Sequence, residues 1–339
     1  MSVSLRDTRF DHIKAQISFA IAGHDPHEAG TWAENRWGAA GRPTAINRSA
    51  EGAISTTGIG VGQPLLDSAI FAAVRDQAIL FRLKGARRTS FNTRAIVAGG
   101  TTASWIDEGA AMPAIRPTFD VIGIDAHKVG GLTVATREAL ETARDIEATI
   151  FAEISAAVVD QLDLALLDPA NDGTGAAPAS LTSAVTAVTS TANPATDLAA
   201  LLATFSGDLR SAYFAMSAVT AAKLAGTEVG RDIGTRGGDL LGVPVLTGRA
   251  VPDNVVALID PASLQVAHDD FIHLSTSEAG AIEADDAPTG DSTEPTPATL
   301  ISLYQSNSIA FRGLLFAGWK KARPGGVAVL TAGASGWLA

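Results

Sequence analysis

The sequence predicts an α+β protein in which one long helix is combined with short, separate β-strands. Three observations support this fold class. A helical pattern runs over residues 137–167, two strand patterns flank a polar loop within 89–127, and short strands alternate with helices over 196–275. The 339 residues, 46% of them hydrophobic, are enough for two domains or one large domain.

The composition disfavours several classes of protein. The 25 basic and 36 acidic residues give a net charge of −11, whereas tight sequence-specific DNA binding needs a clustered basic surface. The absence of cysteine excludes disulfides and thiolate chemistry, and it fits assembly in a reducing cytoplasm. No apolar run approaches the roughly 18 residues of a membrane helix, and residues 1–10 lack the apolar stretch of a secretory signal.

The first 57 residues have the composition of an arm rather than of a domain. Phe10, Ile13, Ile17 and Ile21 are spaced to line one face of a short helix. After Gly23 the chain is polar and rich in Gly, Pro and Asn, so it cannot bury enough apolar area to fold alone. We expect this arm to become ordered against another molecule.

A β-hairpin is predicted next. Thr89–Ala98 and Phe119–Val129 have strand patterns, and Gly99 and Gly100 end the first of them. A polar, proline-containing loop lies between the two strands. Few hairpin residues could form a core of their own, so we expect the hairpin to pack on another surface.

The clearest element is the helix over 137–167. Thr136 is placed to cap its start, and Asp168-Pro169 ends it because proline lacks an N–H donor and clashes with the preceding turn. Its apolar residues form a ridge at i+4 spacing: Ile146, Ile150, Ile154, Val158, Leu162 and Leu166. Its acidic residues fall off this ridge: Glu147, Glu153, Asp160 and Asp163.

The remaining sequence predicts a compact α/β unit followed by closing strands. Helices are expected over Asp197–Phe205 and, capped by Ser217, up to Leu224. Strands are expected at Ala212–Met216 and Val255–Ile259. After an acidic, proline-containing loop at 285–297, the last strands lie within 301–319 and 327–330.

Several local patterns of chemically active residues lack the context that a site requires. His24-Asp25-Pro26-His27-Glu28 has no helix to align metal ligands, and Gly58-x-Gly60-x-Gly62 has no lysine or βαβ unit for a nucleotide. Residues 168–175 lack the closing glutamate of a calcium loop, and Asp285-Asp286 falls in a loop that would not position an acid or base. With no Gly-x-Ser-x-Gly motif either, we predict no catalytic, cofactor or metal residues and no enzyme activity.

The order of these parts, with four local motifs, resembles the major capsid proteins of tailed bacteriophages, which have the Hong Kong 97 fold. The resemblance covers roughly residues 58–335. Two of the motifs lie before or at the start of the long helix: Trp105-Ile106-Asp107-Glu108-Gly109, which precedes Pro113 and Phe119, and Lys128–Glu138, which leads into the helix. The other two lie later in the chain: Leu241-Gly242-Val243-Pro244-Val245, and Gln305–Arg312 followed by Trp319 and Arg323-Pro324-Gly325. Each motif is weak alone, and their order and spacing are specific.

The resemblance implies a division of the chain into the parts of that fold. The implied parts are an N-terminal arm at 1–57, a first peripheral segment at 58–88, an extended loop at 89–127, a peripheral segment at 128–195 with the spine helix at 137–167, an axial α/β domain at 196–275, and closing peripheral strands at 276–339.

It also implies a function and partners. The chain is expected to assemble with itself into hexamers and pentamers of an icosahedral shell around double-stranded DNA, contacted non-specifically, in a virion built in the bacterial cytoplasm. Further implied partners are a portal protein, a scaffold or protease, and a decoration protein, with no membrane and no cofactor. No long charged helix precedes the arm, so we expect no built-in scaffolding domain. Charge and position in the implied fold predict the contact residues between subunits: Trp105, Glu108, Arg116, Lys128, Arg137, Arg144 and Asp145.

Related functions remain open at this point. The shell of an encapsulin nanocompartment shares the fold and encloses protein cargo, and the capsid of a gene-transfer agent is a close variant. A soluble α/β enzyme is the alternative from another class, and it predicts a pocket of convergent titratable residues. Some members of the family join subunits by a lysine–asparagine bond; none of the six lysines lies between Thr89 and Val121, so we expect no such bond through the loop.

Overall fold

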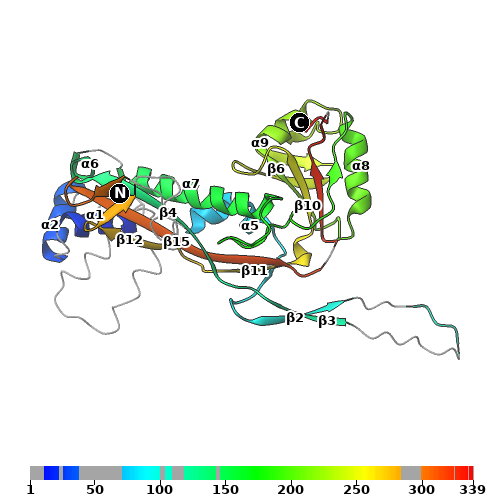
Figure 1. Ribbon diagram of the computed structural model, residues 1–339, viewed down its shortest axis with the longest axis horizontal. Helices are drawn as coiled ribbons and strands as arrows, with labels where there is room; N and C mark the ends of the chain where they lie inside the picture. Colours follow the sequence, from blue (N-terminus) through cyan, green and yellow to red (C-terminus); the bar gives the residue numbers. More distant parts are fainter. Residues whose placement is uncertain are drawn as a thin grey trace, which may run out of the picture. The chain divides into compact units, whose positions relative to one another are not determined.

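The computed structural model describes residues 11–22, 26–37, 71–99, 104–108, 118–142, 146–283, 299–323, 325–334 and 336–338. The chain divides into two compact units, which are treated separately (Figure 1). The first comprises residues 1–74, 130–158 and 270–315, and the second comprises 75–129, 159–269 and 316–339. This mixed helix and sheet architecture confirms the predicted α+β class.

The first unit is built around the long strand β15 (Ser308–Lys321). Strands β4 (His127–Thr136) and β12 (His273–Ser277) both pair with it, and β12 is antiparallel with Thr276 opposite Phe311. A small antiparallel pair is formed by β13 (Ala281–Glu283) and β14 (Leu300–Ser302).

Helix α7 (Ile146–Leu167) supplies the apolar ridge that the sequence predicts. The ridge residues from Ile150 onward are buried: Ile150, Ile154, Val158, Leu162 and Leu166. In the first unit, Gly313 of β15 lies so close to the helix that a Cβ there would be 2.6 Å from Ile154 Cγ2. Only a glycine fits this approach without displacing the ridge.

The described helical residues begin and end where the sequence predicts, at Arg137 and Leu167. The described residues form α6 (Arg137–Thr142) and α7, and residues 143–145 lie outside the described ranges. The predicted cap is present, since Thr136 Oγ1 accepts a hydrogen bond from Ala139 N at 3.3 Å. The helix ends where Asp168-Pro169 predicts. Asp163 is the exception to the pattern: placed off the ridge by sequence, it is buried.

Part of the predicted arm is folded against its own subunit. Helices α1 (Asp11–Ile21) and α2 (Pro26–Trp37) pack together through a small cluster of Ala15, Ala29 and Ala33. The composition argument missed α2 because alanines and a glycine allow two helices to approach closely with little apolar side-chain area. The rest of residues 1–57, and the predicted buried residues Leu65, Leu66 and Ile70, lie outside the described ranges.

The second unit contains a mixed seven-stranded sheet in the order β5-β16-β10-β6-β9-β8-β7. Strand β10 (Val255–Ile259), between β16 and β6, is buried along its whole length, as the predicted run of branched residues indicates. The other strands are β5 (Val188–Thr189), β6 (Tyr213–Ser217), β7 (Ile233–Gly234), β8 (Gly237–Leu240), β9 (Val243–Gly248) and β16 (Val327–Thr331).

Two helices cover this sheet and share one core with it. Residues of α8 (Pro194–Thr204) and α9 (Ala218–Ala225) pack in a single cluster with Phe214, Val256 and Leu330. Ser217 caps α9 by accepting from Thr220 N at 3.1 Å, as predicted, and Asn193 caps α8. The predicted Leu241-Gly242 turn joins β8 to β9, with both residues at positive φ, 55° and 79°.

Smaller elements complete the second unit. Strand β11 (Leu264–His268) pairs with residues 317–321 of β15 and with β1 (Arg87–Arg88). A short helix, α5 (Ile79–Arg82), follows the helical residues 71–77, and the 3-10 turn η3 (Pro261–Ser263) precedes β11.

The predicted hairpin is present with shorter strands. β2 (Arg94–Gly99) and β3 (Thr118–Gly123) are antiparallel and form a two-stranded ribbon (Figure 1). The first strand begins later than predicted because Asn92 turns the chain, at φ 56°, and donates to Ile124 O. The second strand stops at Gly123 because Ile124 turns into the core, and β4 begins at His127.

The approach of β15 to α7 generates the first prediction. We expect Gly313→Ala to lower the free energy of unfolding by about 1–3 kcal/mol, because its Cβ would overlap Ile154 Cγ2. Gly123→Ala is the control, since a Cβ at Gly123 would meet nothing within 4 Å. Urea unfolding of the soluble subunit, followed by circular dichroism, measures the difference. Equal midpoints for both variants would contradict the packing argument.

Candidate assembly surfaces

The structure separates the seven predicted contact residues into three groups. Trp105, Glu108 and Lys128 are exposed, as a contact with another subunit requires. Arg137 is half-buried and bonded within its own unit. Arg116, Arg144 and Asp145 lie outside the described residues. Among the described residues, Trp105, Glu108 and Lys128 therefore stay candidates for contact with another subunit.

Trp105 is the most exposed large apolar side chain in the described part of the chain. It is fully exposed, and the neighbouring Ile106 is 37% exposed. Asp107 and Glu108 follow and are also exposed, so an aromatic side chain and two carboxylates share one short segment, Ser104–Glu108. We call this segment the Trp105 segment.

Arg137 connects three parts of the first unit. Its Nη1 donates to Ile21 O at 2.9 Å, at the end of α1, and its Nη2 donates to Glu278 Oε2 at 2.9 Å. Each side chain of the ion pair is only 28% exposed. The guanidinium thus fixes the N-terminal helices to their own subunit, and Arg36 adds a bond from its Nη1 to Glu141 O at 2.7 Å.

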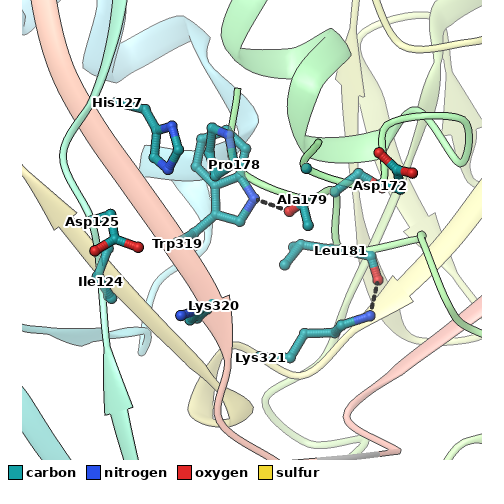
Figure 2. A pocket seen from close by; sticks show the side chains of 12 residues that line it. Ile124, Asp125, His127, Asp172, Pro178, Ala179, Leu181, Trp319, Lys320 and Lys321 are labelled. Atoms are coloured by element: carbon teal, nitrogen blue, oxygen red, sulfur yellow. Dashed lines mark hydrogen bonds between the residues drawn. The ribbon is translucent and has the colours of Figure 1, made fainter. Parts of the chain in front are cut away.

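A cleft of about 260 Å³ lies beside the base of the hairpin in the second unit. We call it the Trp319 cleft, because Trp319 stands in the middle of its labelled residues (Figure 2). Its lining residues come from the link between β3 and β4, the end of β15 and the loop after α7: Ile124, Asp125, His127, Asp172, Gly173, Pro178–Leu181 and Trp319–Lys321.

Hydrogen bonds hold the walls of the Trp319 cleft together. Trp319 Nε1 donates to Ala179 O at 2.9 Å, and His127 Nδ1 is 2.8 Å from Ala176 O. Lys320 Nζ donates to Gly123 O at 2.9 Å, at the end of the hairpin. The cleft and the hairpin base are therefore one connected piece of structure.

The two lysines of the Trp319 cleft differ in burial. Lys320 is exposed, whereas Lys321 is half-buried and donates to Leu181 O at 3.3 Å (Figure 2). Lys321 also donates to Ser183 O at 2.7 Å. Burial lowers the pKa of Lys321 below its ordinary value. Of the two carboxylates in the lining, Asp172 is turned onto Thr174, whose N–H and hydroxyl hold the pKa of Asp172 below its ordinary value.

Further exposed apolar side chains were not predicted as contacts. In the first unit, Leu132 and Val134 lie on the exposed side of β4, and Tyr304 follows β14. In the second unit, Leu209, Val219 and Leu241 are exposed. Burial alternates along β4, but the sequence of residues 128–136 does not alternate between polar and apolar types, so no sequence pattern marked Leu132 and Val134 as outward.

Asp163 is a buried carboxylate in the second unit. Its Oδ1 accepts from Ile79 N at 2.8 Å, and its Oδ2 has no partner. Burial raises the pKa of Asp163 to about 7, although the bond from Ile79 and the charge of Arg82 act in the opposite direction. The carboxyl fastens α5 to α7 and changes its charge near neutral pH.

Two further kinds of feature concern the described ranges, namely metal ligands and membrane-spanning helices. They contain no group of three or more His, Asp or Glu side chains that could hold a metal ion. No helix among the described residues has the length and hydrophobicity needed to cross a membrane.

Solved structures from other particles share the fold of this chain. A structure from Mycobacterium phage Adephagia matches with a TM-score of 0.55 and 15% identity, over 76% of this chain and 91% of that one. The capsid of a native gene-transfer-agent particle, solved with C5 symmetry, matches with a TM-score of 0.51 and 17% identity, over 78% and 91%. These likenesses show the Hong Kong 97 fold, as the sequence predicts.

The family follows from the sequence comparison. The model of the phage capsid family matches residues 58–330, so the chain belongs to the phage capsid family. A capsid polyprotein of Pseudomonas phage PAJU2 is 28% identical over 317 residues, which cover 84% of this chain and 47% of the relative. The chain thus spans about half the length of that relative. The predicted resemblance to tailed-phage major capsid proteins is confirmed, and the chain is a structural protein of a virion capsid.

The bonds of Arg137 generate the second prediction. We expect Arg137→Met to lower the free energy of unfolding by about 2–3 kcal/mol, because it leaves Ile21 O and the Glu278 carboxylate without a charged donor. Arg210→Met is the control: Arg210 is paired with Asp208 but 91% exposed, and we expect no measurable change in the free energy of unfolding. The measurement is urea unfolding at pH 7. A similar small effect for both would show that Arg137 is not a structural clamp.

Asp163 generates the third prediction, a pH dependence. Its folded pKa of about 7 lies above the ordinary 3.8, so the folded state binds the extra proton between these values. The contribution of protonated Asp163 to the free energy of unfolding should therefore be fully present below about pH 4. It should fall by on the order of 4 kcal/mol as the pH rises to about 7, and then level off. In Asp163→Asn this contribution should be absent while Ile79 N keeps an acceptor. Unfolding free energies of both proteins from pH 5 to 8 measure it; parallel curves would contradict the assignment.

Proposed function

We propose that this chain is the major capsid protein of its particle, that it assembles with itself into hexamers and pentamers, and that the resulting icosahedral shell encloses double-stranded DNA. Membership of the phage capsid family and the Hong Kong 97 fold support the proposal. The observation that carries it is the hairpin of β2 and β3, together with the fully exposed Trp105.

A two-stranded ribbon is marginally stable alone, because both of its edges carry unpaired backbone groups and it has no core. A fully exposed tryptophan adds a large apolar area in contact with water. A neighbouring subunit would remove both costs by covering the ribbon and the side chain. We infer that the hairpin is built to pack on a neighbour.

Contacts of this type produce closed rings. A surface of one copy that binds a different surface of the next copy forms a heterologous interface, and such interfaces close when the rotation between copies allows it. Rings of five and of six copies then tile an icosahedral shell. In this proposal the sheet unit with α8 and α9 surrounds the ring centre, and the strands around β15 form the periphery.

The net charge of −11 suits a container for DNA. An acidic or neutral inner wall repels the phosphate backbone and lets the genome be packed and released, whereas a basic wall would hold it. We propose non-specific contact with DNA and no enzyme activity. A portal protein, a scaffold or protease and a decoration protein are the further partners that we propose, with assembly in the bacterial cytoplasm.

The capsid of a gene-transfer agent is the second candidate, favoured by the structural likeness to such a particle. An encapsulin-type compartment is distinguished by its content, since it encloses protein. The nucleic acid and protein content of purified particles separates these alternatives: long phage DNA, short host DNA fragments, or cargo protein.

The fourth prediction concerns Trp105. We expect the expressed protein to form shells in negative-stain electron micrographs, and Trp105→Ala to remain soluble but form none, because about 150–250 Å² of aromatic contact is lost. Deletion of residues 100–117 should have the same result. Trp105→Phe keeps an aromatic ring and should retain assembly. Normal shells from Trp105→Ala and from the deletion would refute the role of the hairpin, and a wild-type protein that stays monomeric would refute the proposed function.

A further inference from the structure

We propose that a groove along the open edge of strand β16 is a docking site for the C-terminal tail of a partner protein, which binds there as an added strand with its carboxylate beside Lys321. The site lies within the second unit, and the inference does not depend on the proposed assembly. Three features support it: an open strand edge, a groove that follows this edge, and a half-buried cation at one end of the groove.

Strand β16 is paired unevenly on its two sides. β10 pairs with it along its whole length, from Val327 to Thr331, whereas β5 pairs only with Leu330 and Thr331. Among the described residues, Val327–Val329 therefore have a strand neighbour on one side only. Unpaired backbone groups of this kind are a template for a further strand.

A groove of about 630 Å³ lies beside this open edge, and we call it the β16 groove. Both Val327 and Ala328 line it. Because consecutive residues of a strand point to opposite faces of a sheet, a hollow that both of them line follows the edge of the strand and not one face of the sheet. Half of the lining comes from residues 184–188, which we call the arch because they lead into β5.

The arch stays apart from β16 until β5 begins. Ala184 has a φ of 56°, a conformation that is uncommon for a residue with a Cβ, and the chain turns there. The chain pairs with β16 only from Val188, which lies opposite Leu330. The gap between the arch and the first half of β16 is therefore built into the local backbone.

The wall and the floor of the β16 groove differ in exposure. Ala184, Thr186 and Ala187 of the arch are exposed, so a ligand can reach this wall. Val327 and Ala328 are only 6% and 2% exposed. Strand addition uses the main chain of β16, so it does not require these two side chains to be accessible. The small side chains of the arch leave room for those of the added strand.

A cation lies at the end of the groove near the start of β16. Lys321, whose Nζ donates to Leu181 O and Ser183 O, is the charged member of the described lining. An ammonium group has three donors, and bonds within the described residues take two of those of Lys321, so a carboxylate can accept from the third. Burial lowers the pKa of Lys321, and a bound carboxylate would favour the charged form again.

The two ends of the groove decide which kind of chain fits. At one end β5 joins β16, and at the other end Lys321 fastens the start of the arch through Ser183 O. A chain terminus needs one exit from such a groove, whereas an internal segment needs two. A terminal carboxylate at Lys321 places the added strand antiparallel to β16. The tail of this chain is not the occupant, because Leu338 is buried in the core of its own sheet.

Binding of short peptides to the full chain tests the proposal. The probes are random peptides with a free C-terminal carboxylate and the same peptides with a C-terminal amide, measured by fluorescence polarisation. We expect the carboxylate peptides to bind, and amidation or Lys321→Gln to weaken binding by about tenfold or more. Lys320→Gln is the matched control, since Lys320 is exposed and lies outside the groove lining, and it should bind as the wild type does.

Two further measurements locate the bound peptide. Ala187→Trp fills the groove from an exposed position, where a substitution has little effect on folding, and it should abolish binding. Hydrogen exchange should show that the bound peptide protects the amides of Val327 and Val329, as an added strand requires.

Three results would overturn the proposal. The first is that no carboxylate peptide binds, and the second is that amidated peptides or the Lys321→Gln protein bind as tightly as the wild-type pair. The third is that decanoate, an alkyl carboxylate without a peptide backbone, displaces the peptide while exchange at Val327 and Val329 stays unchanged throughout. That result would show a pocket for amphipathic anions instead of a strand site.

Discussion

The close approach of strand β15 to its neighbours is the constraint on which the rest of the structure depends. In the first unit it pairs with β12 and packs on α7, where Gly313 leaves room for Ile154. In the second unit it pairs with β11. There, Gly318 lies against the link between the hairpin and β4, and a Cβ at Gly318 would be 2.6 Å from Asp125 O and 2.7 Å from Ile124 Cγ2. Because such contacts leave no space for a side chain, one strand determines where the long helix and the hairpin base can lie.

Polar side chains that are hydrogen-bonded inside the subunit can be distinguished from apolar side chains that are exposed to water. Arg137, Trp319 and Lys321 donate hydrogen bonds inside their own unit, so they hold that unit together. Trp105 and the outward side of β4 are left in water. Apolar area in water is the main driving force for association, whereas exposed ion pairs add little. A subunit with a firm interior and apolar projections is therefore suited to repeated, individually modest contacts, as a capsid shell requires.

The surroundings of some candidate contact residues could be predicted from sequence, and those of others could not. Trp105 was predictable because an aromatic residue within a polar loop has no local core to enter. Arg137 was predicted as a contact with another subunit, and the structure instead bonds it to Ile21 O and Glu278, residues far away in the chain. The Trp319 cleft was not predictable at all, since its walls come from three separated segments that only folding brings together.

The sequence by itself determined the elements whose signals are local. The Ser217 cap, the Asp168-Pro169 helix end, the turn at Leu241-Gly242 and the buried strand β10 all depend on residues within a few positions of one another, and each lies where it was predicted. Tertiary structure alone decided that α1 and α2 pack on their own subunit, that Asp163 is buried, and that the strand after β3 begins anew at His127. These features arise from contacts between distant segments, whose energies no local pattern contains.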